Sequence, residues 1–235
     1  MMTPLKLSLY TIGFLVIMTG CHHDDDDDST VSVNAAMNTI QITPSLGKIL
    51  NAKITLKNAK TGGVLGIANT GSSGSASFQI NTSITHIVAE VTGEATSKYF
   101  DEAKGEQSLP DTISLRVATP VVNNTNVGVS VFTEAAVRHA ETLTDGLSNS
   151  DNIVNANQKI AEAVGMTTIT QAPALIGNDT DYQNLTNDAA SAYALKLAGL
   201  VKMSASSTSS STPALEVLDK LAQDLSDGLI DGKNK

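Results

Sequence analysis

The spacing of apolar and polar residues along the chain changes once, near residue 130. Before this point, short runs alternate between apolar and polar residues and are separated by turn residues. After it, apolar residues recur every three or four positions. Alternation is typical of half-buried strands, and the longer period is typical of amphipathic helices. The pattern therefore predicts an α+β chain with strands in the first half and helices in the second.

The clearest predicted strand lies within Lys48–Asn58, where apolar and polar residues alternate from Ala52 onward. Glycine-containing stretches at 60–63 and 69–74 indicate turns, because glycine readily adopts positive φ. Strands at this short spacing favour an antiparallel β-sandwich over residues 31–130. The other predicted strands are 38–42, 75–80, 86–91 and 111–118.

The order of these strands and turns resembles the carboxypeptidase regulatory-like, transthyretin-type β-sandwich. The residues that carry the resemblance are Gly47, Ile49, Ala52, Ile54, Thr70 and Phe78. The family's glycine just before the aromatic residue is displaced here to Gly74. The resemblance implies an Ig-like or transthyretin-like sandwich.

Four apolar stripes predict about four helices in a helical domain over residues 131–235. The second stripe is followed by Gly165, which is typical of a helix C-terminus. The serine-rich run 204–212 predicts a loop, and Pro213 is placed as the first residue of the fourth helix. The first three helices are expected within 131–143, 152–165 and 185–203, and the fourth has a stripe of Leu215, Leu218, Ala222, Leu225 and Leu229.

This second half resembles a helical module that follows such β-domains in Gram-negative surface lipoproteins and in some pilus-associated envelope proteins. The sequence pattern of this module begins with a threonine, and in this chain another residue takes its place near Val131. The resemblance implies a lipid-anchored envelope protein. The matching residues are Thr133, Glu134, Ala135, Asn157, Gly165, Tyr193, Asp224, Asp227, Gly228, Asp231 and Gly232.

Residues 1–20 are typical of a secretory signal, because the apolar run Leu7–Met18 is too short to span a bilayer comfortably. The segment ending at Cys21 resembles a bacterial lipobox, with Met18 where leucine is usual. The resemblance implies cleavage before Cys21 and acylation (such as palmitate) of its sulfur and new amine, which would anchor the chain in a membrane. The alternative is an ordinary signal peptide followed by a free cysteine.

Residues 21–30 are predicted to form an acidic tether, because five adjacent aspartates repel one another and stay solvated. Loose binding of a divalent cation by His22, His23 and these aspartates is the alternative. In enteric-type sorting, aspartate after the acylated cysteine favours the inner membrane. His22 at this position favours the outer membrane by analogy, and the side of the membrane stays open.

The amino-acid composition limits which partners the protein could bind and which reactions it could catalyse. The chain has 24 acidic and 15 basic residues, a net charge of −9, so phosphate backbones would repel it and we expect no nucleic-acid partner. A single cysteine cannot form an internal disulfide. The sequence contains no HExxH, P-loop, G-x-S-x-G or G-x-G-x-x-G motif, and we expect neither an enzyme nor a bound cofactor.

The most suggestive polar cluster is DLSDGLIDG, which contains Asp224, Asp227 and Asp231. Closely spaced carboxylates with a glycine turn are typical of calcium loops, although the EF-hand order is missing. If the fourth helix continued, the three aspartates would share one face. The alternative is a helix C-terminus with solvated aspartates and a glycine stop.

Other polar residues are predicted to be structural. The loop 177–183 is expected to form an Asx-capped turn, with a metal role for Asp179 and Asp181 as the alternative. Glu102 and Glu106 are expected in a charged surface loop. Tyr99 and Phe100 belong either to the core or to an exposed pair for stacking on sugars.

The sequence therefore predicts a non-catalytic, lipid-anchored envelope protein with a structural or binding role. Two specific roles fit this prediction. The protein is either an accessory of a surface or pilus-like assembly, with envelope or surface proteins as partners, or a protein used for adhesion. The alternative is a calcium-dependent binder of a ligand or polysaccharide that uses Asp224, Asp227 and Asp231. An envelope hydrolase is a third hypothesis.

Overall fold

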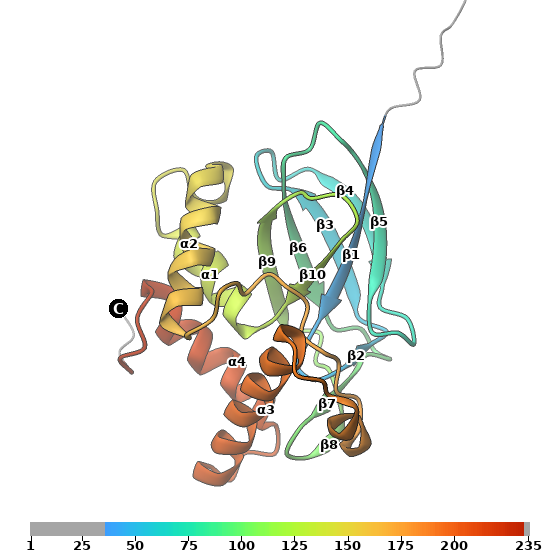
Figure 1. Cartoon of the computed structure of the whole chain (residues 1–235), viewed down its shortest axis with the longest axis vertical. Coiled ribbons are helices and arrows are strands. Elements are labelled where there is room, and N and C mark those ends of the chain that lie inside the picture. Colours follow the sequence, from blue (N-terminus) through green and yellow to red (C-terminus); the bar gives the residue numbers. More distant parts are fainter. Residues whose placement is uncertain (1–35, 233–235) are drawn as a thin grey trace, which may run out of the picture. The chain divides into compact units, whose positions relative to one another are not determined.

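Strands fill the first half of the described chain and helices the second, as the hydrophobic pattern predicts (Figure 1). The computed structural model describes residues 36–232. The predicted signal peptide, Cys21 and the acidic tether lie outside these residues. Within them the structure is α+β, with ten strands in three sheets followed by four α-helices. The change from strands to helices falls between β10 and α1, at Ser130.

The largest sheet is antiparallel and has the strand order β4-β3-β6-β9. A second sheet has the order β10-β1-β5, and a small third sheet has the order β2-β7-β8. The strands are β1 (Met37–Pro44), β2 (Ile49–Leu50), β3 (Lys53–Asn58), β4 (Val64–Asn69), β5 (Ala76–Asn81), β6 (His86–Thr92), β7 (Lys98–Asp101), β8 (Gly105–Ser108), β9 (Ser114–Pro120) and β10 (Thr125–Val129).

One strand pair differs from the predicted antiparallel arrangement. β1 runs parallel to β10, with Ile40 opposite Thr125 and Pro44 opposite Val129. A tight turn forces two consecutive strands to run antiparallel, but β1 and β10 lie at opposite ends of the strand-rich half. No hairpin therefore fixes their relative direction, and local sequence could not reveal it.

The four helices lie close to the predicted positions, and each begins beside a residue suited to capping. Ser130 caps α1 by accepting a hydrogen bond from the Phe132 N–H, Asn149 caps α2 and Asp188 caps α3. Pro213 is the first residue of α4, as predicted. The helices are α1 (Val131–Glu141), α2 (Ser150–Ala163), α3 (Ala189–Ser207) and α4 (Pro213–Asp224), with short 3₁₀ turns η1 (Gly146–Ser148), η2 (Asp179–Asn184) and η3 (Leu225–Asp227).

Two details of the helical prediction are wrong. α3 continues to Ser207, into the run expected to be a loop, and the Ser206 and Ser207 hydroxyls donate to carbonyls of the same helix. α4 ends at Asp224, and a left-handed Gly228 follows η3, so the apolar stripe stops at Leu225. Leu229, expected in the buried stripe, is 51% exposed.

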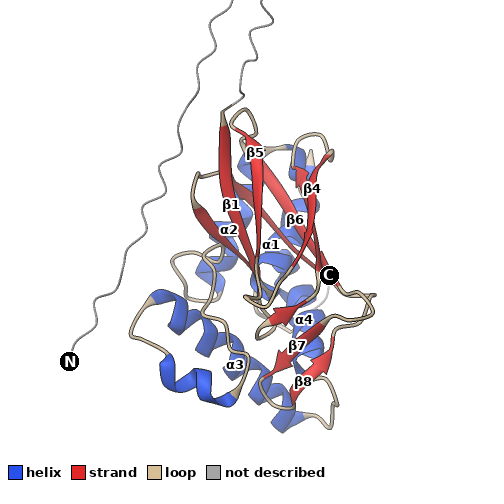
Figure 2. Cartoon of the chain, turned by 90° about the vertical axis from the view of Figure 1, so that its right-hand side faces the viewer, coloured by secondary structure: helices blue, strands red, loops and turns tan. Residues whose placement is uncertain are grey.

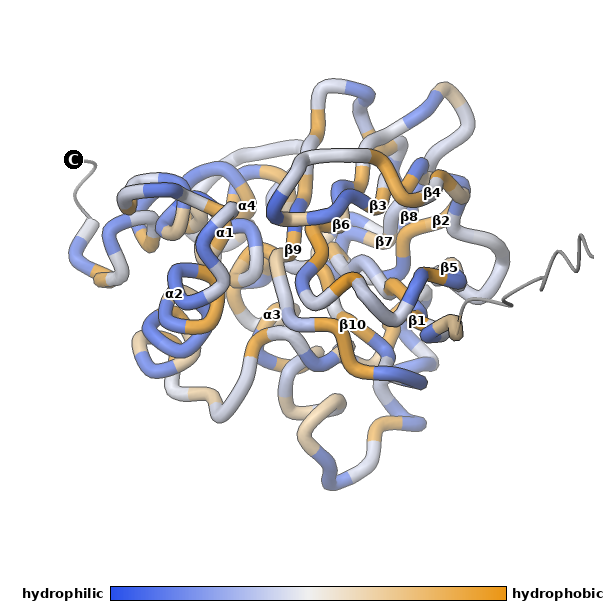
Figure 3. Tube along the Cα trace, turned by 90° about the horizontal axis from the view of Figure 1, so that it is seen from above, coloured by the Kyte–Doolittle hydropathy of each residue, from blue (hydrophilic) through white to orange (hydrophobic). Residues whose placement is uncertain are grey.

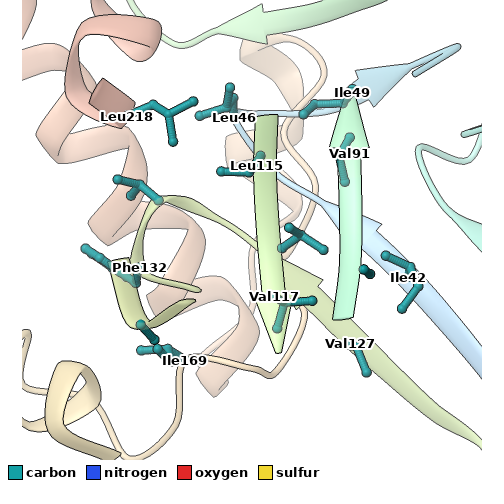
Figure 4. Close-up of a cluster of buried hydrophobic side chains, with 14 of the residues drawn as sticks. Ile42, Leu46, Ile49, Val91, Leu115, Val117, Val127, Phe132, Ile169 and Leu218 are labelled. Atoms are coloured by element: carbon teal, nitrogen blue, oxygen red, sulfur yellow. The ribbon is translucent and has the colours of Figure 1, made fainter. Parts of the chain in front are cut away.

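The sheets and helices share one apolar core. Figure 4 shows Ile42 from β1, Val91 from β6 and Leu115 from β9 in the same cluster as Phe132 of α1 and Leu218 of α4. The described strands and helices accordingly all belong to one compact unit. Figure 3 shows how apolar residues recur along both strands and helices.

The largest sheet also contributes side chains to a second, smaller cluster. Val88 of β6 and Ala118 of β9 pack there against Val137 of α1 and Ile153 of α2. Asn157 of α2 donates a hydrogen bond to the Ala118 carbonyl at 2.8 Å. Helices α1 and α2 therefore cover the face of this sheet at β9, as the arrangement in Figure 1 shows. None of the helices in the described part of the chain is long and apolar enough to cross a membrane.

A buried tyrosine joins α3 to the junction between β10 and α1. The Tyr193 hydroxyl lies 2.5 Å from Ser130 Oγ and donates to the Ile169 carbonyl at 3.0 Å. Its ring stacks on Phe132 with centroids 5.8 Å apart. Burial raises the pKa of Tyr193, so the hydroxyl stays neutral and able to donate.

We predict that Gly47→Ala lowers the free energy of unfolding by about 2–4 kcal/mol. Gly47 has φ +66°, and an added Cβ would lie 2.0 Å from the Phe100 carbonyl oxygen. Gly62→Ala is the matched control, because Gly62 has φ +71° but no atom within 4 Å of the added Cβ. The control should cost about 1 kcal/mol. Urea unfolding of both variants measures the difference, and equal losses would contradict the role of the close approach at Gly47.

Candidate functional site

The aspartates predicted to bind calcium lie where the chain turns after α4. Asp224 is the last residue of α4, Asp227 ends η3, and Gly228 then adopts φ +84°. The helix therefore ends here with a glycine stop, and the common face that a continued helix would give Asp224, Asp227 and Asp231 does not form. Asp227 Oδ1 instead accepts a hydrogen bond from the Leu229 N–H at 2.9 Å.

The same turn is attached to the first two helices. His139 Nδ1 of α1 lies 2.9 Å from the Ser226 carbonyl oxygen, and Lys159 Nζ of α2 donates to the Asp227 carbonyl at 3.0 Å. His139 is 9% exposed, so it is a packed residue. The contacts give His139 and Asp227 a structural role, which is to tie the end of α4 to α1 and α2.

Within residues 36–232, no group of three or more His, Cys, Asp or Glu side chains could hold a metal ion. Calcium binding at the three aspartates remains a hypothesis for experiment. Cys21, the predicted acylation site, lies outside these residues.

The loop 177–183 forms the predicted Asx-capped turn. Asn178 Oδ1 accepts hydrogen bonds from the Thr180 and Asp181 N–H groups, at 2.8 and 3.2 Å. Asp181 Oδ2 accepts from the Gly177 N–H at 2.7 Å. The capping residue is thus Asn178, and Asp181 closes the same turn.

Two neighbouring carboxylates are buried, although the sequence predicts a charged surface loop at this point. Asp101 ends β7 and is completely inaccessible, and Glu102 is 6% exposed. Asp101 is well satisfied, because its carboxylate accepts from the N–H groups of Ala103, Lys104 and, at the start of α4, Ala214. Tyr99 and Phe100, just before them, are also buried, so they belong to the core rather than to an exposed pair.

Glu102 lies in a polar cluster made by three elements: the turn after β7, η2 and α3. Its Oε2 and the hydroxyls of Tyr99 and Tyr182 are buried and have no hydrogen-bond partner among the described residues. The Glu102 carboxylate interacts electrostatically with both tyrosines and with Lys202 of α3. Lys202 Nζ lies 5.6 Å from the centroid of the Tyr182 ring.

The pKa of Glu102 is raised to about 7, mainly by burial and also by the nearby Asp101, against the opposing effects of a hydrogen bond from its own backbone and of Lys202. Burial likewise raises the pKa of Tyr182 to about 12, with Glu102 adding to the effect. Glu102 therefore changes its protonation near neutral pH. Glu106, by contrast, is exposed and pairs with Lys98 across β7 and β8.

Glu134 is the other buried carboxylate, and it is fully partnered. It is 2% exposed and accepts hydrogen bonds from the Arg116 N–H, Nε and Nη2 at 2.9, 3.1 and 2.9 Å, and from Arg138 Nε at 2.8 Å. Arg116 also binds Glu141. Burial lowers the pKa of Arg116, but hydrogen bonds and charge from Glu134 and Glu141 outweigh it and raise the pKa overall. This network joins β9 to α1.

A cavity of about 530 Å³ lies between α3 and α4, lined in part by Leu200, Val217 and Leu221. Two charged residues in its lining, Glu216 and Lys220, pair with each other, and Glu216 also accepts a hydrogen bond from Thr208. The cavity and the Glu102 cluster have no residue in common.

The comparisons with known proteins return no match: no protein-family model fits the chain, and no curated protein or solved structure matches it significantly. The resemblances to the transthyretin-type sandwich and to the lipoprotein helical module therefore remain predictions from the sequence.

We predict that Glu102 makes the protein less stable as pH rises. The folded state holds the Glu102 proton up to a pKa of about 7, whereas its ordinary value is 4.5. Between these values the folded state binds more protons than the unfolded state, so the free energy of unfolding falls as pH increases. In Glu102→Gln, the fall in the free energy of unfolding with rising pH should be smaller by about 1–3 kcal/mol.

Denaturant unfolding between about pH 5 and pH 8 measures the effect. Glu106→Gln is the matched control, because Glu106 is exposed and its ion pair with Lys98 lies at the surface, where such pairs contribute little to stability. The control should follow the wild type. Parallel pH profiles for the wild type and Glu102→Gln would contradict the prediction.

We predict that calcium produces no saturable binding heat with the wild-type chain, because Asp224, Asp227 and Asp231 do not form a group that could hold a metal ion within residues 36–232. Asp227→Ala should lower the free energy of unfolding by about 1 kcal/mol through loss of the hydrogen bond between its carboxylate and the Leu229 N–H. Isothermal calorimetry with calcium tests the first statement. Saturable heat that disappears in Asp227→Ala would instead support the calcium hypothesis.

Proposed function

We propose that this chain is a lipid-anchored protein of a bacterial cell envelope, and that its α+β body acts by structure or binding rather than by catalysis. The observation that carries the proposal is the position of Cys21. It is the only cysteine in 235 residues, and it directly follows Thr19 and Gly20, the two small residues after the apolar run Leu7–Met18. One acyl chain holds a protein only marginally on a membrane, so acylation of both sulfur and amine would give a stable anchor.

The sequence between the anchor and the body supports this arrangement. The 15 residues at positions 22–36 separate Cys21 from β1, which starts at Met37. A chain of this length reaches at most about 50 Å when extended. Five of these residues are consecutive aspartates, which favour water over packing. His22 after the cysteine favours the outer membrane by analogy with enteric sorting.

The contacts of Glu134, Asp101 and Glu90 support a non-catalytic role, whereas Glu102 is the buried carboxylate with an unpartnered oxygen among the described residues. Glu134 is held by Arg116 and Arg138, and Asp101 accepts backbone hydrogen bonds. The hydrogen bond from Lys57 lowers the pKa of Glu90. These groups serve the fold. We infer that the body contacts envelope or surface proteins, as an accessory of a surface assembly or as an adhesion module.

We also propose that the two larger sheets form a sandwich of the transthyretin type. Alternate residues of both sheets meet in one core, among them Ile42 of β1, Ile54 of β3 and Phe78 of β5. Such convergence of two inner faces is what a sandwich requires. The parallel pair of β1 and β10 is a departure from the fully antiparallel pattern.

We predict that Cys21→Ala abolishes incorporation of radiolabelled palmitate and moves the protein from the membrane fraction to the soluble fraction. His22→Ala is the matched control, because it changes the next side chain and leaves the thiol in place, so labelling and membrane association should persist. Mass spectrometry of the mature amino terminus gives the lipid mass directly. A bare thiol at this terminus, or unchanged membrane partition of Cys21→Ala, would refute the anchor.

A further inference from the structure

One continuous part of this acidic chain carries no charge. Residues 61–85 contain no Asp, Glu, Lys, Arg or His, although the whole chain has a net charge of −9. The segment includes both β4 and β5. The two strands are neighbours in space, and Figure 2 views them from the side on which they lie. We call Val64–Asn69 and Ala76–Asn81 the uncharged flank.

Both strands of the uncharged flank are sheet edges. β4 ends the order β4-β3-β6-β9, and β5 ends the order β10-β1-β5. Within the described residues, β3 is the strand that pairs with β4, so the other backbone edge of β4 has no partner strand. Unpaired backbone groups of an edge strand are ready to bind another strand.

The side chains of β4 add apolar surface to this edge. Val64 and Ile67 are 57% and 62% exposed, and the apolar character of β4 is visible in Figure 3. Proteins usually protect such an edge with lysine, proline or an inward-pointing charge. The sequence VLGIAN of β4 contains none of these residues. The register of the β3–β4 pair shifts between Leu56 and Lys57, so the regular edge of β4 is the part from Gly66 to Asn69.

We propose that the uncharged flank binds the same flank of a second copy of this chain. Two copies with a net charge of −9 repel each other where acidic residues face, and the uncharged flank is a surface where they approach without that cost. A two-fold axis places identical patches in contact, so Val64 and Ile67 of each copy would cover those of the other.

The flank itself gives a charged partner nothing to pair with, because β4 and β5 carry no charged side chain. On the adjoining β3, Lys57 is paired with Glu90 at 2.7 Å, and Lys53 lies at the end of the strand, opposite Asn69. A charged peptide would therefore find no unpaired countercharge on β4 or β5. A second copy matches the flank in both its apolar side chains and its unpaired backbone groups.

Sedimentation of the full chain in detergent tests the proposal. The wild type should be a dimer at about 100 µM, and Ile67→Lys should weaken dimerisation at least about 10-fold, because two lysines would face each other across the axis. Leu195→Lys is the matched control, since Leu195 is 51% exposed on α3, away from the flank. It should remain a dimer, and circular dichroism should show that both variants fold.

Two results would overturn the proposal: a wild type that is monomeric at this concentration, or an Ile67→Lys variant that dimerises like the wild type. A Cys21→Ala chain separates this proposal from the lipid anchor. It should still dimerise, whereas loss of the dimer together with the lipid would assign association to the acyl chains and contradict the role of the flank.

Discussion

The fold depends on a buried carboxylate at the junction of its strands and helices. Glu134 of α1 is almost inaccessible, and its four hydrogen bonds come from Arg116 of β9 and Arg138 of its own helix. A buried charge that loses its partner is strongly destabilising. α1 can therefore pack on β9 in the one position that brings Glu134 to Arg116. Thr133 strengthens this position by donating to the Arg116 carbonyl at 2.8 Å.

The position of α1 in turn places the other helices. Ser130 caps α1 and bonds to Tyr193 of α3, and the Tyr193 ring stacks on Phe132. The end of α4 is attached to α1 through His139 and to α2 through Lys159. Since the apolar core also runs from the sheets into α1 and α4, strands and helices are joined both by packing and by polar contacts.

The sequence predicts the elements whose pattern is local. Alternation in β3 and the apolar stripes of the helices depend only on nearby residues, and the structure contains both. The sequence does not predict β4, β7, β8 and β10, because β7 and β8 are only four residues long and β4 (VLGIAN) does not alternate cleanly. Glu102 and Glu106 look alike in sequence, yet one is buried and one exposed, since tertiary packing from η2 and α3 decides burial.

The central claim is that Glu134 and Arg116 hold strands and helices in one cooperative unit. Differential scanning calorimetry of the wild type and Glu134→Ala tests it most directly. The account predicts a single transition for both proteins, with that of Glu134→Ala at a temperature lower by roughly 6–20 °C, given a loss of about 3–5 kcal/mol. Two separate transitions, of which Glu134→Ala shifts only one, would show that strands and helices unfold independently and would contradict the account.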